Sequence, residues 1–218
     1  MADRFTFDEH GLLPAVVQDW LDGTVLMLGY MNQEALAKTV ATRSVHFWSR
    51  SRQALWEKGE TSGHKLAVKN LFLDCDGDTI LVKAQALGPT CHTGERACFF
   101  SKLDEAGSPV PLKSSEAFGG ILDSVLAIIG DRRARPQPGS YTTKLFQSGH
   151  DTILKKVAEE AGEVLIAAKG GTREELIYEV ADLLFHTLMV LGYHGISLQE
   201  VYQELGARYG KSGLRPQP

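Results

Sequence analysis

Residues 154–168, with the sequence LKKVAEEAGEVLIAA, decide the fold of the C-terminal part of the chain. Their apolar residues recur at helical spacing, which predicts an amphipathic helix with one apolar stripe. The stripe consists of Leu154, Val157, Ala161, Val164, Leu165 and Ala168. The same period recurs within 121–129, 176–188 and 198–205. Four helices with apolar faces predict an all-α helical bundle.

Glycines mark the expected ends of two of these helices. Gly170-Gly171 follows the second helical pattern and Gly195 follows the third, as is common at helix C-termini. Between Arg132 and His150 no period can be counted, and Pro136 and Pro138 lie there. We expect this segment to be a long irregular connection.

The N-terminal part of the chain has the pattern of strands with one helix. Asn32 is a candidate N-cap for a helix that contains Ala35, Leu36 and Val40. Turn signals such as Asp22-Gly23 and Asp76-Gly77 separate short β-favouring runs, which lie at 15–17, 24–30, 45–48, 66–73 and 79–87. The pattern predicts an α+β domain with mostly antiparallel strands.

The composition changes between these two parts. The stretch Gly107-Ser108-Pro109-Val110-Pro111 contains little apolar material, which is typical of a linker. We therefore predict two domains of unlike class, at 1–103 and 119–218, joined by a linker at 104–118.

Overall composition limits the function. The 218 residues are 43% hydrophobic and 23% charged, which excludes a disordered, collagen-like or coiled-coil chain. The 27 acidic residues outnumber the 23 basic ones, which argues against nucleic acid as a partner. The N-terminus lacks the pattern of a secretory signal, and Asp182 and His186 interrupt the apolar run 180–191. That run is shorter than the ~20 residues of a membrane span, so we expect a soluble cytoplasmic protein.

All three cysteines lie between residues 75 and 98. Clustering of this kind favours a metal site, and Cys75, Cys91 and Cys98 are candidate zinc ligands. Three thiolates would leave a fourth position for a water whose pKa zinc lowers to about 7. His92 could accept a proton or be a fourth ligand. Alternatively the cysteines are small buried hydrophobes, although Cys91 lies in a polar loop.

The segment 74–78, Asp-Cys-Asp-Gly-Asp, contains three carboxylates besides Cys75. On an extended backbone Asp74, Asp76 and Asp78 would point the same way and could bind a hard cation such as Mg²⁺. An acidic turn without a cation remains the alternative.

Two polar segments upstream mix cations, hydroxyls and glycine. Ser49-Arg50-Ser51-Arg52 and the stretch from Glu57 to His64 have the composition that phosphate binding uses. A solvated loop would have a similar composition.

The predicted helices bring carboxylates together at helical spacing. Glu159, Glu160 and Glu163 lie on neighbouring turns of one helix, and Glu179 and Asp182 lie one turn apart on the next. Asp182 is flanked by the core stripe, and His186 follows it by four residues. A divalent cation shared between the helices explains this arrangement, whereas solvated acidic faces explain Asp182 poorly.

The motifs of the N-terminal part occur in an order that resembles the phosphoribosyl-AMP cyclohydrolase family over nearly all of 13–100. They are Gly29-Tyr30-Met31-Asn32, Ser49-Arg50-Ser51-Arg52, Lys58-Gly59-Glu60-Thr61-Ser62-Gly63, Asp74-Cys75-Asp76-Gly77-Asp78 and Cys91-His92-Thr93-Gly94-Glu95-Arg96. The resemblance implies hydrolytic opening of an adenine ring in histidine biosynthesis, by a homodimer whose zinc site takes cysteines from both subunits.

This first resemblance also implies residue roles. Zn²⁺ would be held by Cys75, Cys91 and Cys98, and Mg²⁺ by Asp74, Asp76 and Asp78, while His92 assists proton transfer. The residues expected to bind the substrate are Arg50, Arg52, Lys58, Thr61 and Ser62.

The helical part, over about 120–206, is similar to the phosphoribosyl-ATP pyrophosphohydrolase family. The similarity rests on Lys144-Leu145-Phe146, Lys155-Lys156-Val157-Ala158-Glu159-Glu160 and Glu179-Val180-Ala181-Asp182-Leu183. It implies a helical oligomer in which a water attacks next to the α-phosphate and pyrophosphate leaves. Mg²⁺ would be bound by Glu160, Glu163, Glu179 and Asp182; Glu159 would orient the water, and Lys144, Lys155 and Lys156 would contact phosphates.

Together the resemblances predict a bifunctional enzyme of histidine biosynthesis whose C-terminal domain acts first. Two alternatives are a nucleotide-cleaning pyrophosphatase with a degenerate second domain, and a non-catalytic interaction module stabilised by zinc. Intact ligand sets in both parts argue against the first. Three rather than four zinc ligands, together with the distant acidic helices, argue against the second.

Overall fold

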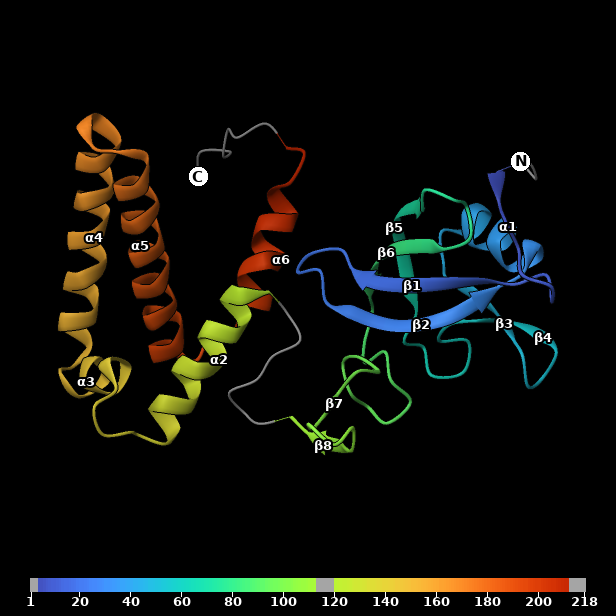
Figure 1. Cartoon of the computed structure of the whole chain (residues 1–218), viewed down its shortest axis with the longest axis horizontal. Coiled ribbons are helices and arrows are strands. Elements are labelled where there is room, and N and C mark those ends of the chain that lie inside the picture. The colour runs from blue at the N-terminus through green and yellow to red at the C-terminus, as the bar shows by residue number, and fades with distance from the viewer. Residues whose placement is uncertain (1–3, 113–119, 212–218) are drawn as a thin grey trace. The chain divides into compact units, whose positions relative to one another are not determined.

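The structure, a computed structural model, describes residues 4–112 and 120–211. The chain divides into two compact units, Met1–Pro111 and Leu112–Pro218. The first unit is rich in strands and the second is helical (Figure 1). The prediction of two domains of unlike class is therefore confirmed.

A four-stranded sheet forms the centre of the first unit, in the order β2-β1-β6-β5. Its strands are β1 (Leu13–Asp19), β2 (Val25–Met31), β5 (Leu66–Leu73) and β6 (Ile80–Ala86). The two hairpins, β1–β2 and β5–β6, are antiparallel, and β1 and β6 join them as a parallel pair. The sheet is thus mostly antiparallel, as predicted.

The crossover between the hairpins contains α1 (Gln33–Thr42), β3 (His46–Ser49) and β4 (Ala54–Glu57). Asn32 caps α1 as predicted, because its Oδ1 accepts a hydrogen bond of 2.8 Å from the Ala35 N–H. Strand β4 was not predicted, because its four residues, Ala-Leu-Trp-Glu, are too few for an alternating pattern to be counted.

Gly29 on β2 allows the core to close. A Cβ atom at this position would lie 2.4 Å from the Cδ1 and Cε1 atoms of Phe47. Phe47 is 1% exposed and belongs to the main core, whose fully buried members include Leu13, Val17, Leu26, Leu66 and Val82. Only glycine lets this ring pack directly on the strand.

Part of the predicted linker folds instead as a hairpin of β7 (Ser101–Leu103) and β8 (Pro109–Pro111). Asp104 shapes its turn, since Oδ1 accepts hydrogen bonds from the backbone N–H groups of Ala106 and Ser108. Contacts within the chain group this hairpin with the first unit, up to Pro111, and the domain bounds 1–103 and 119–218 stay a prediction. Residues 113–118 of the predicted linker lie outside the described residues.

The second unit contains α2 (Ile121–Ala134), α3 (Tyr141–Gln147), α4 (His150–Gly170), α5 (Arg173–His194) and α6 (Leu198–Arg208). The four predicted helical patterns correspond to α2, α4, α5 and α6. The connection predicted to be irregular contains α3. Ser140 is the N-cap of this helix, and its Oγ accepts a hydrogen bond from Thr143 N–H. At seven residues, α3 is too short to show a hydrophobic period.

The ends of α4 and α5 agree with the glycine signals. The last residue of α4 is Gly170, and Gly195 ends α5 in the left-handed conformation with φ of 69°. The start of α5 has a capping box, in which Thr172 and Glu175 exchange hydrogen bonds.

The predicted apolar stripe of α4 is not its buried face. Ile153, Glu160 and Ala167 are buried, whereas Leu154 is 43% and Leu165 72% exposed. The buried residues recur every seven positions, so α4 turns a face containing a carboxylate towards the interior. In the single chain half of the stripe is exposed and the other half, Val157, Ala161 and Val164, is half-buried.

Helix α5 is longer than the apolar run seen in the sequence. Its 22 residues are long and apolar enough to cross a membrane, by length and composition only. In this fold α5 packs against α2 and α4. It also carries Glu179 and Asp182, whose carboxylates contribute to the acidic cluster described below.

Candidate active sites

The three aspartates of the first unit come together at a turn. Carboxylate oxygens of Asp74, Asp76 and Asp78 all lie within 4.8 Å of one another. Gly77 has φ of 80°, and Asp74 Oδ1 accepts hydrogen bonds of 3.0 Å from the N–H groups of Asp78 and Thr79. The carboxylates thus converge because the chain turns, and not through the strand alternation that the sequence suggested.

Hydrogen bonds in this turn keep one carboxyl charged. Desolvation raises the pKa of Asp74, but hydrogen bonds from Thr79 and Asp78 lower it by more. The pKa therefore lies below the ordinary aspartate value of 3.8. All three carboxylates are exposed. The turn therefore presents anionic oxygens to solvent, as a site for a hard cation requires.

Cys91 and Cys98 lie next to each other. A hydrogen bond of 3.1 Å from Thr93 Oγ1 to Cys91 Sγ, with further backbone hydrogen bonds, lowers the pKa of the Cys91 thiol. Desolvation and the charge of Cys91 raise the pKa of Cys98, and the charge of Lys58 opposes that rise. Two predicted zinc ligands and one predicted substrate-binding lysine thus share one locality.

Cys75 lies apart from that pair. It is exposed on the acidic turn, with Sγ 3.9 Å from Asp76 Oδ1. Among residues 4–112 and 120–211, no group of three close metal-binding side chains includes a cysteine. One chain therefore brings together two of the three predicted zinc ligands.

An arginine holds the loop that carries Cys91. Arg96 Nη2 lies 2.5 Å from Asp22 Oδ2 and 3.4 Å from Asp19 Oδ2, and both aspartate side chains are buried. The backbone of the loop closes on itself, with Cys91 N–H donating to Glu95 at 3.0 Å. His92 is exposed beside this turn, with Nδ1 3.9 Å from Cys91 Sγ.

A pocket of about 490 Å³ contains the predicted arginines. The Arg50 guanidinium lies 3.9 Å from the centre of the Tyr30 ring, and that of Arg52 lies 5.7 Å from the Trp56 ring. Thr61 and Ser62 are exposed and do not line this pocket. The aromatic walls of this pocket, which were not predicted, are formed by Tyr30, Trp48 and Trp56.

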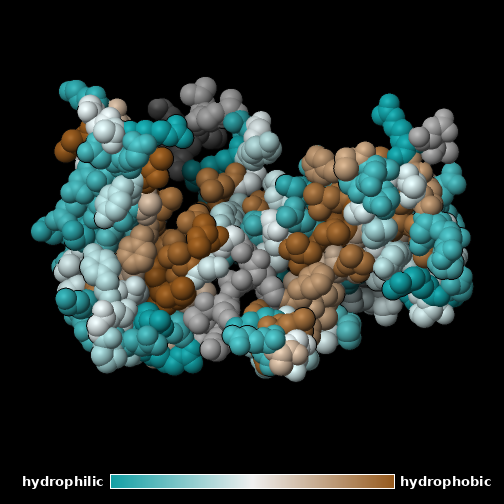
Figure 2. Space-filling model, in the orientation of Figure 1, coloured by the Kyte–Doolittle hydropathy of each residue, from teal (hydrophilic) through white to brown (hydrophobic). Residues whose placement is uncertain are grey.

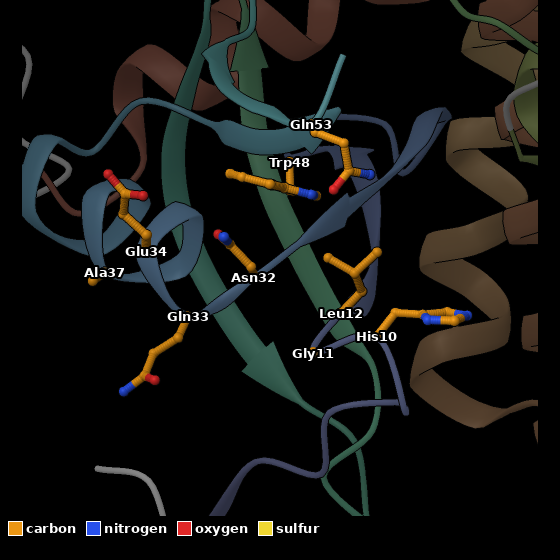
Figure 3. A pocket seen from close by; sticks show the side chains of 9 residues that line it. All are labelled: His10, Gly11, Leu12, Asn32, Gln33, Glu34, Ala37, Trp48 and Gln53. Carbon is orange, nitrogen blue, oxygen red and sulfur yellow. The ribbon is translucent and has the colours of Figure 1, made fainter. Parts of the chain in front are cut away.

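A second pocket, of about 600 Å³, shares Trp48 with the first. In Figure 3 the Asn32 side chain points towards the first turn of α1, and Gln53 lies beside the Trp48 ring. Gln33 and Glu34 point away at the start of α1. The two pockets therefore flank one indole ring, which the sequence pattern did not reveal.

The acidic cluster of the second unit is formed by two helices. Carboxylate oxygens of Glu160 on α4 and of Glu179 and Asp182 on α5 lie within 4.8 Å of one another. Burial, and then the charges of Glu163 and Asp182, raise the pKa of Glu160 above 4.5. Burial and the charge of Glu163 do the same to Glu179. Glu163 thus adjoins both residues, although it lies outside the tight group.

One carboxylate oxygen of this cluster has no hydrogen-bond partner. Glu179 Oε2 is buried without a hydrogen-bond partner, and Glu160 is 6% exposed. Buried carboxylates that raise each other's pKa need a compensating charge. Oxygen ligands from two helices at this spacing suit a hard divalent cation.

The lysines of α4 surround a different carboxylate. Lys156 Nζ lies 2.8 Å and Lys155 Nζ 3.1 Å from the carboxylate of Glu159, whose pKa their hydrogen bonds lower. Lys156 Nζ also lies 3.8 Å from Glu160 Oε1. Of the predicted phosphate-binding lysines, Lys156 thus reaches the edge of the cluster. Lys144 is exposed on α3.

Two aromatic rings adjoin the acidic cluster without having been predicted. The charge of Asp182 raises the pKa of the Tyr178 hydroxyl. Tyr141 on α3 contacts the edge of the His186 ring. Tyr178 could have been predicted, because it lies four residues before Asp182 on the same helix face. Tyr141 is brought close only by tertiary packing.

The fold and these clusters define a two-domain hydrolase with a separate candidate metal centre in each domain. Residues 27–100 match the family model for phosphoribosyl-AMP cyclohydrolase, and residues 122–209 match the one for phosphoribosyl-ATP pyrophosphohydrolase. The chain belongs to the family of bifunctional histidine-biosynthesis enzymes that join these two domains.

Relatives from two bacteria cover nearly the whole chain. A histidine biosynthesis bifunctional protein HisIE of Synechocystis is 48% identical over 207 residues, which are 94% of this chain and 93% of the relative. The protein of the same description from Bacillus subtilis is 46% identical over 210 residues, which are 96% and 97% of the two chains. Because both domains match, the comparisons argue against a pyrophosphatase with a degenerate second domain and against a non-catalytic interaction module.

Proposed function

We propose that the two domains act in sequence on one phosphoribosyl nucleotide. The helical unit would hydrolyse phosphoribosyl-ATP to phosphoribosyl-AMP and pyrophosphate, and the strand-rich unit would then open the adenine ring hydrolytically. The observation that carries this proposal is that each unit has its own acidic cluster, located inside the segment that matches the corresponding family.

In the helical unit, Glu160, Glu163, Glu179 and Asp182 would hold Mg²⁺. The cation would neutralise charge on the triphosphate and on the leaving pyrophosphate. Glu159 is paired with Lys155 and Lys156 in this structure. We infer that phosphate oxygens of the substrate take over these lysines, together with Lys144, and so release the Glu159 carboxylate to orient the attacking water.

In the strand-rich unit, Zn²⁺ would be held by Cys91, Cys98 and Cys75 of the partner subunit, and Mg²⁺ by Asp74, Asp76 and Asp78. Zinc would lower the pKa of a water molecule. His92, exposed beside Cys91, would transfer a proton to or from the adenine ring. Phosphate groups would be bound by Arg50, Arg52, Lys58, Thr61 and Ser62.

A homodimer is part of this proposal, because one chain pairs Cys91 with Cys98 but not with Cys75. Apolar surface is visible on both units (Figure 2). The exposed apolar side chains of the helical unit include six on α4 and α5, namely Leu154, Leu165, Ile166, Ile177, Val180 and Leu184. A two-fold partner would cover such a surface. The cytoplasmic location remains a prediction.

Single substitutions test whether the two sites are independent. The purified full-length protein would receive phosphoribosyl-ATP, and both products would be followed. Cys91→Ala should stop ring opening and leave pyrophosphate release intact. Glu163→Ala should slow pyrophosphate release, while ring opening of supplied phosphoribosyl-AMP continues. Loss of both activities in either folded variant would contradict the proposal.

Mixing inactive chains tests the shared zinc site. Cys75→Ala and Cys91→Ala chains, each without ring-opening activity, would be co-expressed with different affinity tags. A mixed dimer combines an intact Cys75 with an intact Cys91 and Cys98 at one of its two sites, so about a quarter of the wild-type activity should return in an unselected mixture. Without any return of activity, the zinc site cannot be shared between subunits.

A further inference from the structure

His186 is a buried histidine of the helical unit to which the reaction as described assigns no role. It lies on α5, one turn after Asp182, and it is 4% exposed. Its Nε2 atom lies 3.6 Å from Oε1 of Glu160, across the interface between α4 and α5. A polar ring in this position is costly unless its nitrogens have partners.

Aromatic neighbours fix the orientation of this imidazole. Tyr141 and Phe185 contact it edge to face, with ring centroids 6.1 and 5.2 Å away and interplanar angles of 86° and 82°. Nδ1 is buried without a hydrogen-bond partner. A neutral imidazole carries one proton, and on Nε2 that proton faces a carboxylate, whereas on Nδ1 it would be a buried donor without an acceptor. The packing therefore favours the tautomer that points N–H at Glu160.

We propose that His186 is a positioning residue whose Nε2–H group, 3.6 Å from Oε1 of Glu160, attracts and orients that oxygen, so that the other carboxylate oxygen is presented to the cation. Lys156 Nζ lies 3.8 Å from the same Oε1 and reinforces this orientation. Groups that orient a ligating carboxylate in this way are worth about 10- to 100-fold in metal affinity. The inference rests on the proposed cation site of Glu160, Glu179 and Asp182.

Replacing His186 by glutamine or by asparagine distinguishes a positioning role of this side chain from a packing role. The nitrogen of a glutamine side chain can reach the place of Nε2, whereas that of an asparagine reaches only the place of Nδ1. Mn²⁺ binding to the full-length protein would be measured from the electron paramagnetic resonance signal of the free ion, in an Asp76→Asn background that removes the acidic turn as a second site. His10→Gln, which changes an exposed histidine, is the matched control.

We expect His186→Gln and His10→Gln to retain Mn²⁺ affinity within about threefold, and His186→Asn to lose about tenfold. At saturating Mn²⁺, pyrophosphate release by His186→Asn should recover, because the cation then occupies the site despite a mobile Glu160. Circular dichroism without cation would show that both variants fold.

The outcomes distinguish this inference from the function on which it rests. Equal Mn²⁺ affinity of folded His186→Asn and the parent, or equal losses in His186→Asn and His186→Gln, would overturn the positioning role alone. If the parent itself bound no Mn²⁺, or if Asp182→Asn left its binding unchanged, the cation site and the positioning role would both be wrong.

Discussion

The two acidic clusters of this protein are built in opposite ways. Asp74, Asp76 and Asp78 come from one five-residue turn, are exposed, and include a carboxyl whose pKa hydrogen bonds lower. Glu160, Glu179 and Asp182 come from two helices, and burial together with mutual repulsion raises the pKa of the two glutamates. In a cluster within one turn, backbone N–H groups of that turn can stabilise the negative charge. In a cluster across two helices, a positive charge from outside the cluster must compensate the negative charges.

The two units therefore differ in how their cation-binding residues affect the stability of the fold. The acidic turn can exist without a cation, because N–H groups and water satisfy its oxygens. In the helical unit, the charges that would hold the cation oppose the packing of α4 on α5. We therefore expect cation binding and folding to be coupled more strongly in the helical unit.

The largest expected effect is a domain-specific loss of activity. Asp182→Asn should slow pyrophosphate release by at least about 100-fold, equivalent to about 2.7 kcal/mol of transition-state stabilisation. Ring opening of supplied phosphoribosyl-AMP should be unchanged. Asp76→Asn is the matched substitution in the other cluster and should show the reverse pattern. Equal effects of both substitutions on one reaction would remove the distinction between the clusters.

The next effect is stabilisation by divalent cations. At about ten times its dissociation constant, a cation that binds only the folded state contributes about 1.4 kcal/mol. For a unit of this size that should raise the melting temperature by several degrees. Differential scanning calorimetry with Mg²⁺ or with chelator would resolve it. Asp182→Asn should abolish the shift, and Asp76→Asn should leave it in place.

A smaller effect is expected at the start of α5, which positions Glu179. Thr172→Ala removes the capping box and should cost about 1 kcal/mol of the stability of the helical unit. Urea unfolding followed by far-ultraviolet circular dichroism would measure it. Thr172→Ser, which retains the hydroxyl, is the control. A change in the ring-opening reaction would indicate an effect beyond this helix.

The smallest effect concerns pH and has opposite signs in the two clusters. Without cation, the contribution of Glu160 is fully present below pH 4.5 and is lost as pH rises through its raised pKa. That of Asp74 is present above pH 3.8 and is lost as pH falls through its lowered pKa. His186, whose pKa burial lowers, adds a separate dependence below pH 6.5.

Glu160→Gln isolates the carboxylate in this experiment. With chelator present, the melting temperature of Glu160→Gln minus that of the wild type should increase from pH 5 to pH 8, because only the wild type acquires a buried charge in this range. A constant difference across this range would mean that Glu160 is not desolvated in the metal-free protein.

The parts of both sites that were predictable are those that lie close together in the sequence. The Asp74–Asp78 motif and the spacing of Glu160, Glu163, Glu179 and Asp182 identify the clusters, and Asn32 and Gly195 mark helix ends that the structure confirms. The apolar stripe of α4 was predicted, but not which face of the helix is buried in the single chain, where Leu154 and Leu165 are exposed. Periodicity identifies an apolar face, but not what covers it.

The features that were not predicted either depend on contacts between distant segments or are too short to show a pattern. The aromatic walls around Arg50 and Arg52 come from separate strands, and the Tyr141–His186 contact joins α3 to α5. The β7–β8 hairpin and α3 are too short for a repeating pattern to be counted. Neither kind of feature has a signature within one window of sequence.

The missing side chain of Gly29 has a consequence for tolerance to mutation. Any Cβ atom there meets the Phe47 ring, so substitution would displace a core residue that immediately precedes Trp48, the indole shared by both pockets. Position 29 thus couples the interior of the sheet to the shape of the cavity. In a library of single substitutions selected for growth without added histidine, we expect this position to accept glycine alone.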